Sequence, residues 1–372
     1  MRILVTGGAG FIGSHLVEAL VRRGHAVRVL DSLDAQVHGA QRLQPAYLNP
    51  AAELVLGEVS DISLVERAMD GMVAVFHFAA AVGVGQSMYE VRRYVEANTL
   101  GGANVLEVLT RGRHQVRKVV VASSMSVYGE GAYRCPNCGE VYPTLRSKEQ
   151  LRQRWWDPRC PTCQSVLTPV PTREDKSLCP TSIYAITKRD HEEMFLCVGR
   201  AYGIPTTALR YFNVYGPRQA LSNPYTGAAA IFCARFLSGH APLIFEDGLQ
   251  TRDFVHVQDI IQANLLALDR PEADFEVFNV GTGRQTSVLD LAKVIGKALG
   301  SPKEPQISGR FREGDIRHCF ADVSKIRQTL GYKASVSLEE GLGNLVPQIS
   351  EQLIQDQVDQ ATAELARKRL VW

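Results

Sequence analysis

The chain has 372 residues, of which 45% are hydrophobic and 22% are charged, and its formal net charge is +2. This length is typical of about two domains, and the composition is that of a globular protein. Because the charge is nearly balanced, nothing favours a nucleic acid or an acidic membrane surface as a partner. The sequence has no apolar run near the roughly 20 residues that span a bilayer and no leader with a cleavage pattern. We therefore expect a cytoplasmic protein.

Seven short runs rich in Val, Ile and Leu are predicted to be strands, at residues 2–6, 26–30, 53–56, 74–77, 118–122, 206–210 and 276–279. Most are continuously apolar, as strands buried on both faces of a parallel sheet should be. Helical patterns lie between them, for example at residues 14–23, 98–111 and 183–202. This alternation predicts an α/β fold with a Rossmann doubly wound parallel sheet.

The alternation loosens after Asn213, where several prolines and glycines interrupt the chain. We therefore predict that residues 1–130 and 171–212 form the Rossmann domain. Residues 213–345 are expected to form a smaller C-terminal substrate-binding lobe, from which a strand near 276–279 returns to the sheet. Residues 346–372 have helical spacing and are predicted to form a C-terminal surface helix. Residues 131–170, which hold four of the eight cysteines, are predicted to be an insertion.

A glycine-rich loop follows the first predicted strand and opens the first predicted helix. Its glycines are Gly7, Gly10 and Gly13, and Phe11 and Ile12 lie beside them. Without side chains, the glycines let the backbone turn tightly and approach a pyrophosphate, which then sits at the helix N-terminus. We therefore predict a dinucleotide site; the alternative is an ordinary glycine-rich turn.

Two acidic positions follow later strands of the predicted sheet. Asp31 ends the second strand, where a carboxylate accepts the ribose hydroxyls of NAD and repels the extra phosphate of NADP. Asp61 and Ile62 follow the third strand and are placed to bracket the adenine. NAD is therefore the expected cofactor. The alternatives are a turn-forming aspartate at Asp31 and a loop or helix-cap aspartate at Asp61.

A tyrosine and a lysine four residues apart lie on one face of a predicted helix, as Tyr184 and Lys188. A nearby ammonium and a positive nicotinamide ring would lower the pKa of the phenol from its usual value of about 10. The phenolate could then take a proton from a sugar hydroxyl while hydride leaves for NAD. Ser123 and Ser124 end the fifth strand, at the ligand-facing edge of the sheet. We assign Ser124 to catalysis and Ser123 to the nicotinamide.

Together these motifs resemble the extended short-chain dehydrogenases/reductases, the family of NAD-dependent nucleotide-sugar epimerases and dehydratases. The matching segments are residues 6–13, 77–80, 124–129, 184–188 and 210–218, and the likeness runs from residue 1 to about 343. The resemblance implies that the cofactor also contacts Phe78, Ala79, Ala80, Asn98 and Phe212. It further implies a sugar pocket that includes Val84 and a substrate diphosphate bound by Asn213, Arg252 and Arg312. Arginines hold diphosphates through charge-assisted hydrogen bonds; the alternative for each is a structural ion pair.

The reaction is narrowed by Met125 and Ser126, which follow the catalytic serine. Dehydratases of the family carry Asp-Glu there, decarboxylases a glutamate and 3,5-epimerases a cysteine at the second position. Neither Met nor Ser readily deprotonates a sugar carbon. We therefore expect a 4-epimerase that oxidises and re-reduces C4 of a nucleotide-diphosphate sugar, with tightly bound NAD. The alternatives are an oxidoreductase or dehydratase that releases a keto sugar, and a non-catalytic NAD-binding scaffold.

Four cysteines form two C-x-x-C pairs, Cys135 with Cys138 and Cys160 with Cys163. Four thiolates at such spacing suit a tetrahedral zinc ion and leave no open coordination position. We predict a structural zinc ribbon at residues 131–170, with redox dithiols or disulfides as the alternatives. More residues separate the catalytic Ser and Tyr here than in the family, and the extra length corresponds to this segment. The insertion should therefore emerge beside the active site.

The resemblance also implies the partners of the protein. Epimerases of this family with a cysteine-rich insertion resemble the group that acts on dTDP-6-deoxyhexoses such as dTDP-L-rhamnose, although UDP- and GDP-sugars stay open. The predicted helices at 98–111 and 183–202 pair into a dimer-forming four-helix bundle in proteins that resemble this one. A homodimer is therefore implied.

Overall fold

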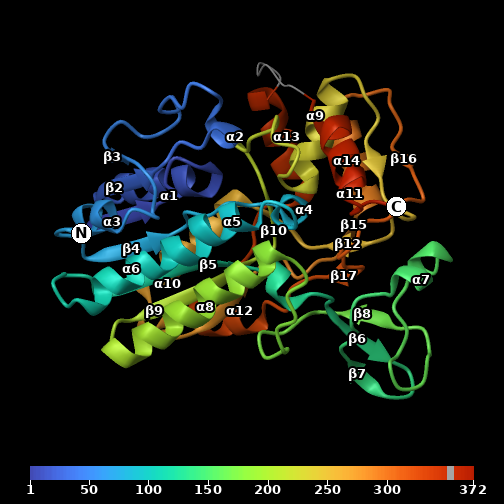
Figure 1. Ribbon diagram of the computed structural model, residues 1–372, viewed down its shortest axis with the longest axis horizontal. Coiled ribbons are helices and arrows are strands. Elements are labelled where there is room, and N and C mark those ends of the chain that lie inside the picture. Colours follow the sequence, from blue (N-terminus) through green and yellow to red (C-terminus); the bar gives the residue numbers. More distant parts are fainter. Residues whose placement is uncertain (350–355) are drawn as a thin grey trace.

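A parallel sheet of seven strands forms the centre of the computed structural model, which describes residues 1–349 and 356–372 (Figure 1). The strands, in the order β14-β9-β5-β4-β1-β2-β3, confirm the predicted sheet. Their bounds differ from the predicted ones by at most two residues at either end. They are β1 (Arg2–Thr6), β2 (Ala26–Asp31), β3 (Glu53–Leu56), β4 (Ala74–His77), β5 (Lys118–Ser124), β9 (Thr206–Tyr211) and β14 (Val277–Val280).

Helices cover both faces of this sheet, because successive strand side chains point to opposite faces. Ile3 and Val5 of β1 pack into one apolar core, and Leu4 packs into the other. The first core involves α1 (Phe11–Arg22), α10 (Val257–Asp269) and α12 (Ser324–Leu330), and the second involves α3 (Ile62–Met69), α6 (Gly101–Thr110) and α8 (Ile183–Tyr202). The doubly wound arrangement is therefore present.

The helix predicted at residues 98–111 is part of a longer helical run that begins at α5 (Val91–Tyr94). A π-helical turn, η1 (Val95–Leu100), joins α5 to α6. Short elements fill other connections: α2 (Ala35–His38), α4 (Val84–Ser87), η2 (Met125–Tyr128) and η3 (Pro271–Ala273).

The C-terminal lobe has a core of its own, built around α9 (Ala228–Leu237), α11 (Val288–Ala298) and α13 (Leu338–Ile349). Its strands form three small sheets: β10 (Asn213–Tyr215) with β13 (Phe254–His256), β11 (Leu243–Ile244) with β16 (Gln306–Ile307), and β12 (Thr251–Arg252) between β15 (Thr286–Ser287) and β17 (His318–Cys319). Within the range 213–345 predicted for the lobe, α10 and α12 join β14 in packing with the main sheet.

The predicted insertion is an antiparallel unit of β6 (Ala132–Cys135), β7 (Gly139–Val141) and β8 (Thr168–Val170), with α7 (Lys148–Arg152) beside it (Figure 1). Its apolar core is small, consisting of Tyr133, Cys135, Cys160 and Leu167 with Val141 against them. A core of this size stabilises little by itself, so the unit needs a further constraint.

The prediction of one helix over residues 346–372 is wrong for the described part of that range. α13 reaches Ile349, residues 356–357 are not helical, and α14 (Val358–Arg367) follows; residues 350–355 lie outside the described residues. α14 is also more than a surface helix, because its Ala361 and Leu365 are buried. None of the described helices is long and apolar enough to cross a membrane.

Candidate active site

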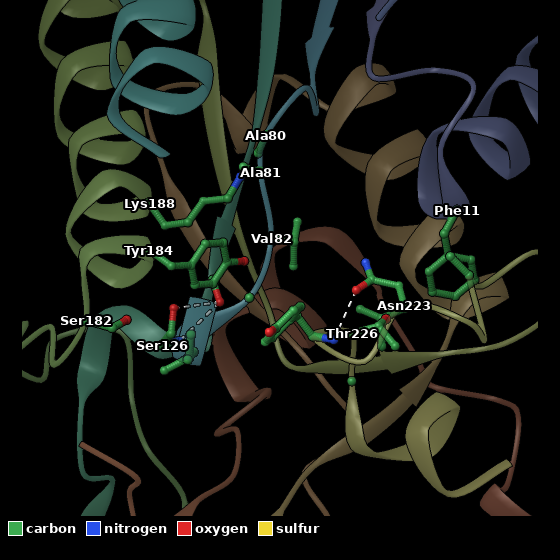
Figure 2. A pocket seen from close by; sticks show the side chains of 18 of the residues that line it. Phe11, Ala80, Ala81, Val82, Ser126, Ser182, Tyr184, Lys188, Asn223 and Thr226 are labelled. Carbon is green, nitrogen blue, oxygen red and sulfur yellow. Dashed lines mark hydrogen bonds between the residues drawn. The ribbon is translucent and has the colours of Figure 1, made fainter. Parts of the chain in front are cut away.

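A cavity of about 840 Å³ opens at the carboxyl ends of the central strands (Figure 2). Residues at or just beyond the ends of β1, β2, β4, β5 and β9 line one side, and the C-terminal lobe and α14 line the other. Ligands of open α/β sheets bind at this edge, so the fold places the candidate site where a dinucleotide is expected.

The glycine loop forms one wall of the cavity, as Gly7, Gly10, Phe11, Ile12 and Gly13 all line it. Gly7 has a φ of +69°, which favours glycine. A Cβ on Gly13 would lie 2.2 Å from the carbonyl oxygen of Gly7, so no side chain fits there. The loop thus presents bare backbone at the start of α1, which fits the pyrophosphate of a dinucleotide.

Asp31 lies at the end of β2 and lines the cavity, as predicted. Its carboxylate accepts hydrogen bonds from the backbone N–H groups of Ala9 and Leu33, each 2.9 Å long. It therefore also braces the glycine loop against β2. Asp61 and Ile62, in contrast, are not among the residues that line the cavity. The carboxylate of Asp61 caps α3 by accepting from the amides of Ser63 and Leu64.

The segment after β4 brings Phe78, Ala79 and Ala80 to the cavity, and Phe212 lines it from the end of β9. Asn98 does not line the cavity and is fully buried. Its amide accepts from the backbone N–H of Ala81 at 2.7 Å and donates to the carbonyl of Ala81 at 3.1 Å and to Thr187 at 2.9 Å. Asn98 therefore supports the segment of Ala81 from behind the cavity wall, and its direct contact with a cofactor stays a prediction.

Tyr184 and Lys188 extend from the first turns of α8 into the cavity (Figure 2). Ser182 starts this helix by accepting a hydrogen bond from the amide of Ala185, so the tyrosine sits close to the helix start. The ammonium of Lys188 donates to the carbonyl of Ala122 on β5 at 3.0 Å. The lysine is thus fixed between the helix and the strand that bears Ser124.

Burial controls the ionisation of both groups. Burial lowers the pKa of Lys188 to about 7. It raises the pKa of Tyr184, and a hydrogen bond with Ser124 partly opposes this rise. The predicted lowering of the tyrosine pKa is thus not produced by the protein's own groups. The physical reason is that desolvation disfavours the phenolate.

Ser123 and Ser124 both line the cavity, but their hydroxyls differ. The hydroxyl of Ser123 donates to the carboxylate of Glu192 at 2.8 Å, and its contact with the nicotinamide stays a prediction. The oxygen of Ser124 accepts from the backbone amide of Ser126 at 3.2 Å and lies 2.9 Å from its hydroxyl. Met125 and Ser126 line the cavity as well, so the position next to Ser124 carries no ionisable group.

The predicted substrate residues Val84, Asn213, Arg252 and Arg312 all line the same cavity. The side-chain oxygen of Asn213 and the Nε of Arg312 are buried without a hydrogen-bond partner. Over the described ranges of the chain, neither Arg252 nor Arg312 forms an ion pair with a carboxylate. The alternative of a structural ion pair is therefore not found for either arginine. The guanidinium of Arg252 instead donates to the backbone carbonyls of Thr251, Ile316 and Arg317 at 2.8 to 3.0 Å, whereas Arg312 keeps an unpaired Nε.

Other cavity residues were not predicted from the sequence. Gly57, Glu58, Val59 and Ser60 lie where Asp61 and Ile62 were expected, and Val358, Ala361, Thr362 and Leu365 of α14 line the cavity together with Leu370. The amphipathic spacing of α14 was visible in the sequence. Nothing in that spacing indicated which surface its apolar face would meet.

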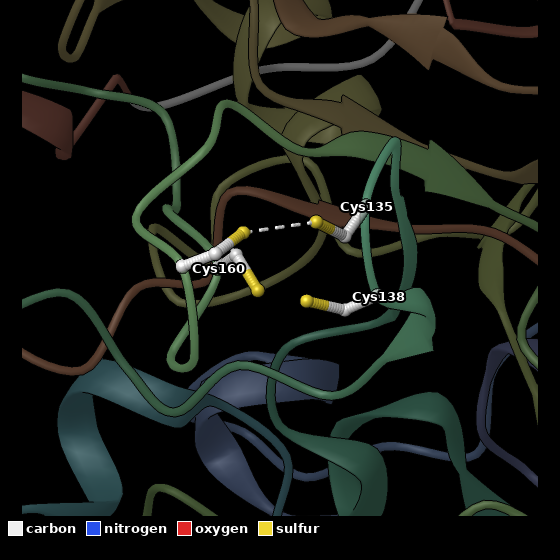
Figure 3. A group of neighbouring side chains, drawn as sticks. Cys135, Cys138 and Cys160 are labelled. Carbon is white, nitrogen blue, oxygen red and sulfur yellow. Dashed lines mark hydrogen bonds between the residues drawn. The ribbon is translucent and has the colours of Figure 1, made fainter.

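The four cysteines of the insertion form a compact cluster (Figure 3). Their sulfur atoms all lie within 4.8 Å of one another, and those of Cys135 and Cys163 are 3.4 Å apart. Sulfur ligands 2.3 Å from a tetrahedral zinc ion are about 3.8 Å apart. All eight cysteines are unbonded in this structure. The donor set therefore fits a metal ion.

The fold and the cavity define a Rossmann-type protein with a Ser-Tyr-Lys site of the short-chain dehydrogenase/reductase kind. The sequence pattern of the NAD dependent epimerase/dehydratase family matches residues 3–147 and 163–281. The chain belongs to this family.

Individual relatives are similar over nearly the full length. A dTDP-L-rhamnose 4-epimerase of Burkholderia thailandensis is 37% identical, over 95% of this chain and 96% of its own. The crystal structure of a Thermotoga maritima UDP-glucose 4-epimerase with UDP-glucose has a TM-score of 0.75 and 34% identity, covering 94% of this chain and 98% of that one. The structure of a Thermus thermophilus UDP-glucose 4-epimerase in complex with NAD has a TM-score of 0.73 and 29% identity, covering 95% of this chain and 100% of that one.

Proposed function

We propose that the protein is an NAD-dependent epimerase that inverts C4 of a nucleotide-diphosphate sugar. One observation carries this proposal: Tyr184, Lys188 and Ser124 meet at the cavity, while the two positions after Ser124 hold only Met125 and Ser126. A site without a second acid or base can exchange a proton and a hydride at one carbon, but it lacks the group that removes water or a carbon-bound proton. The similarity to 4-epimerases supports the same reaction.

The residues divide the chemistry among them. NAD, held by the glycine loop and Asp31, would supply the hydride acceptor and donor for the sugar carbon. Tyr184 accepts the proton of the C4 hydroxyl and later gives it back, and the Ser124 hydroxyl donates a hydrogen bond to the reacting oxygen. Lys188, held by the Ala122 carbonyl, would help to orient a bound dinucleotide beside the tyrosine. A positive charge bound next to Tyr184 would offset the rise in its pKa that burial causes.

The substrate is proposed to be a dTDP-6-deoxyhexose such as dTDP-L-rhamnose. Asn213, Arg252 and Arg312 would hold its diphosphate through charge-assisted contacts. The sugar side of the cavity is partly apolar, since Val84 and Leu365 line it. Such a wall suits a sugar whose C6 is a methyl group. The similarity to the Burkholderia enzyme points the same way.

The remaining proposals concern the assembly. The Cys135–Cys138 and Cys160–Cys163 pairs would hold a structural zinc ion in the insertion. The protein would work as a homodimer in the cytoplasm, where thiols stay reduced.

The test is to incubate the purified protein with dTDP-, UDP- and GDP-sugars and to resolve the products by NMR, while measuring NAD and zinc in the same sample. We expect about one NAD per chain and interconversion of C4 epimers without net consumption of added NAD. Stoichiometric use of NAD with a keto or acid product would overturn the epimerase assignment. A protein that holds no dinucleotide and changes no sugar would overturn the enzyme assignment altogether.

A further inference from the structure

Arg146, in the insertion between β7 and α7, is buried although it carries a charge, with a side chain only 1% exposed. Its guanidinium donates two hydrogen bonds to the carboxylate of Glu246, at 2.8 and 2.9 Å. It also donates to the backbone carbonyls of Trp156 at 2.8 Å and Asp315 at 3.0 Å. A planar guanidinium is suited to such a fork, which fixes both partners in direction as well as distance.

Two of these partners belong to the walls of the candidate active site, as Glu246 and Asp315 both line the cavity. The amide of Glu246 donates to the carbonyl of Arg310 at 2.7 Å, so the two wall segments also touch each other. Arg146 does not line the cavity itself. It joins the insertion to two segments that do, and one of them, residues 310–316, carries Arg312.

The insertion holds the 310–316 segment at a second place, through α7. Lys148 lies 3.4 Å from the carboxylate of Glu313 and 3.4 Å from the ring centre of Trp372. Trp372 in turn exchanges two backbone hydrogen bonds with Phe311, on the other side of Arg312. The loop that bears Arg312 is thus fixed from both of its ends by groups that belong to, or contact, the insertion.

Arg312 has few contacts of its own that would fix its direction. Its guanidinium lies 4.2 Å from the ring centre of Phe245, and its buried Nε has no hydrogen-bond partner. Because no carboxylate in the described part of the chain pairs with it, its direction depends on the backbone that carries it. A shift of this loop would therefore move the cation directly.

We propose that Arg146 is a positioning residue for the substrate: it couples the cysteine-bearing insertion to the loop of Arg312 and thereby sets the affinity for the nucleoside diphosphate group. The inference rests on the proposed function, which assigns Arg312 to the diphosphate. It assigns the insertion a task at the active site in addition to its own local stability.

The test compares the Arg146→Met variant with wild-type protein, both loaded with NAD. Glu246 keeps a buried cation in this variant, because Arg317 donates to it at 3.0 Å. The matched control is Arg134→Met, which removes an exposed arginine from β6 of the same insertion. Binding of dTDP and UDP is measured by calorimetry, and KM and kcat are measured with the nucleotide sugar that the wild type converts.

We expect Arg146→Met to bind the diphosphate ~10-fold more weakly and to raise KM by a similar factor, with kcat changed less than ~3-fold. NAD content should stay at the wild-type level, and Arg134→Met should match the wild type throughout. This split between KM and kcat would not follow from a general loss of structure. Equal diphosphate affinity in Arg146→Met and wild type would overturn the inference.

If Arg146→Met does not fold, Arg146→Lys carries the test, since a lysine keeps the charge but cannot form the fork. Weaker diphosphate binding with unchanged NAD content would support the inference, and wild-type affinity would overturn it. A wild-type protein that binds neither dTDP nor UDP would overturn the proposed function, and this inference with it. A wild type that binds them while both variants bind equally well overturns only the role of Arg146.

Discussion

Tyr184 and Lys188 illustrate how one environment shifts two neighbouring groups in opposite senses. Burial disfavours both charged forms, so it raises the pKa of the phenol and lowers that of the ammonium. A base at position 184 is therefore created only when another positive charge lies beside it. This dependence would keep the tyrosine protonated until the cofactor is in place.

Replacing Tyr184 with Phe should nearly abolish epimerisation, because it removes the group proposed to take the C4 proton. We expect kcat to fall ~10³-fold or more, within the range typical of a lost acid–base group, while bound NAD and the unfolding temperature stay close to wild type. Product formation is followed by NMR and NAD by its release on denaturation. Substantial residual turnover would contradict the assignment of the base.

The pKa of Lys188, lowered to about 7 from its usual 10.5, also makes a prediction about stability. Between these values the unfolded chain binds more protons than the folded one, so the free energy of unfolding should rise with pH across this window. Lys188→Met removes that difference. The free energy of unfolding of this variant should exceed that of wild type by a few kcal/mol at pH 6 and by less at pH 9.5, as measured by urea unfolding. An equal gain at both pH values would contradict the lowered pKa.

Residue types and their spacing were enough to predict the reacting side chains but not every neighbour. The Tyr-x-x-x-Lys spacing and the glycine loop specify geometry within one helix or one turn, so their residues reached the cavity. Asp61 and Asn98 depended on contacts between distant segments. A loop aspartate readily caps a nearby helix, and a buried asparagine readily hydrogen-bonds to backbone groups that lack a partner. In both cases that local demand prevailed.

At the scale of elements, the strands were the most predictable part of the molecule, because continuous apolar runs report burial on both faces. The π-helical turn η1 and the break before α14 were not visible, since a helical pattern does not reveal a local change in hydrogen bonding. The position of α14 against the cavity depends on a long-range contact. The sequence contains no local signal for it.

The insertion should depend on its thiols, because its apolar core consists of few residues. We expect about one zinc ion per chain, and removal of the metal or the Cys160→Ser substitution should lower the first unfolding temperature by several degrees. Substrate affinity should weaken while NAD stays bound. Zinc is measured by mass spectrometry and unfolding by calorimetry. Cys197→Ser, on the exposed side of α8, is the matched control and should change neither the zinc content nor the unfolding temperature.

For the whole molecule, exposed apolar side chains gather on the helices expected to form a dimer interface. Val95, Leu100 and Ile186 lie on η1 and α8 and are each 42–43% exposed. Leu100→Glu with Ile186→Glu should therefore shift the protein from dimer to monomer in analytical ultracentrifugation. Tyr202→Glu, which alters an exposed aromatic residue at the far end of α8, is the control and should stay dimeric. A wild type that sediments as a monomer would contradict the proposal.

The order of strands in the central sheet has a consequence for how the chain is made. β2 and β4 pair with β1, β3 with β2, β5 with β4, β9 with β5, and β14 with β9. Every strand after the first therefore finds its partner in a segment that has already left the ribosome. The sheet can therefore grow outward from β1 during synthesis, and each newly made strand can pair as soon as it emerges. Among the edges that a later strand covers, that of β5 stays open longest, because its partner β9 begins only at Thr206, so aggregation of the nascent chain should be most sensitive to this interval.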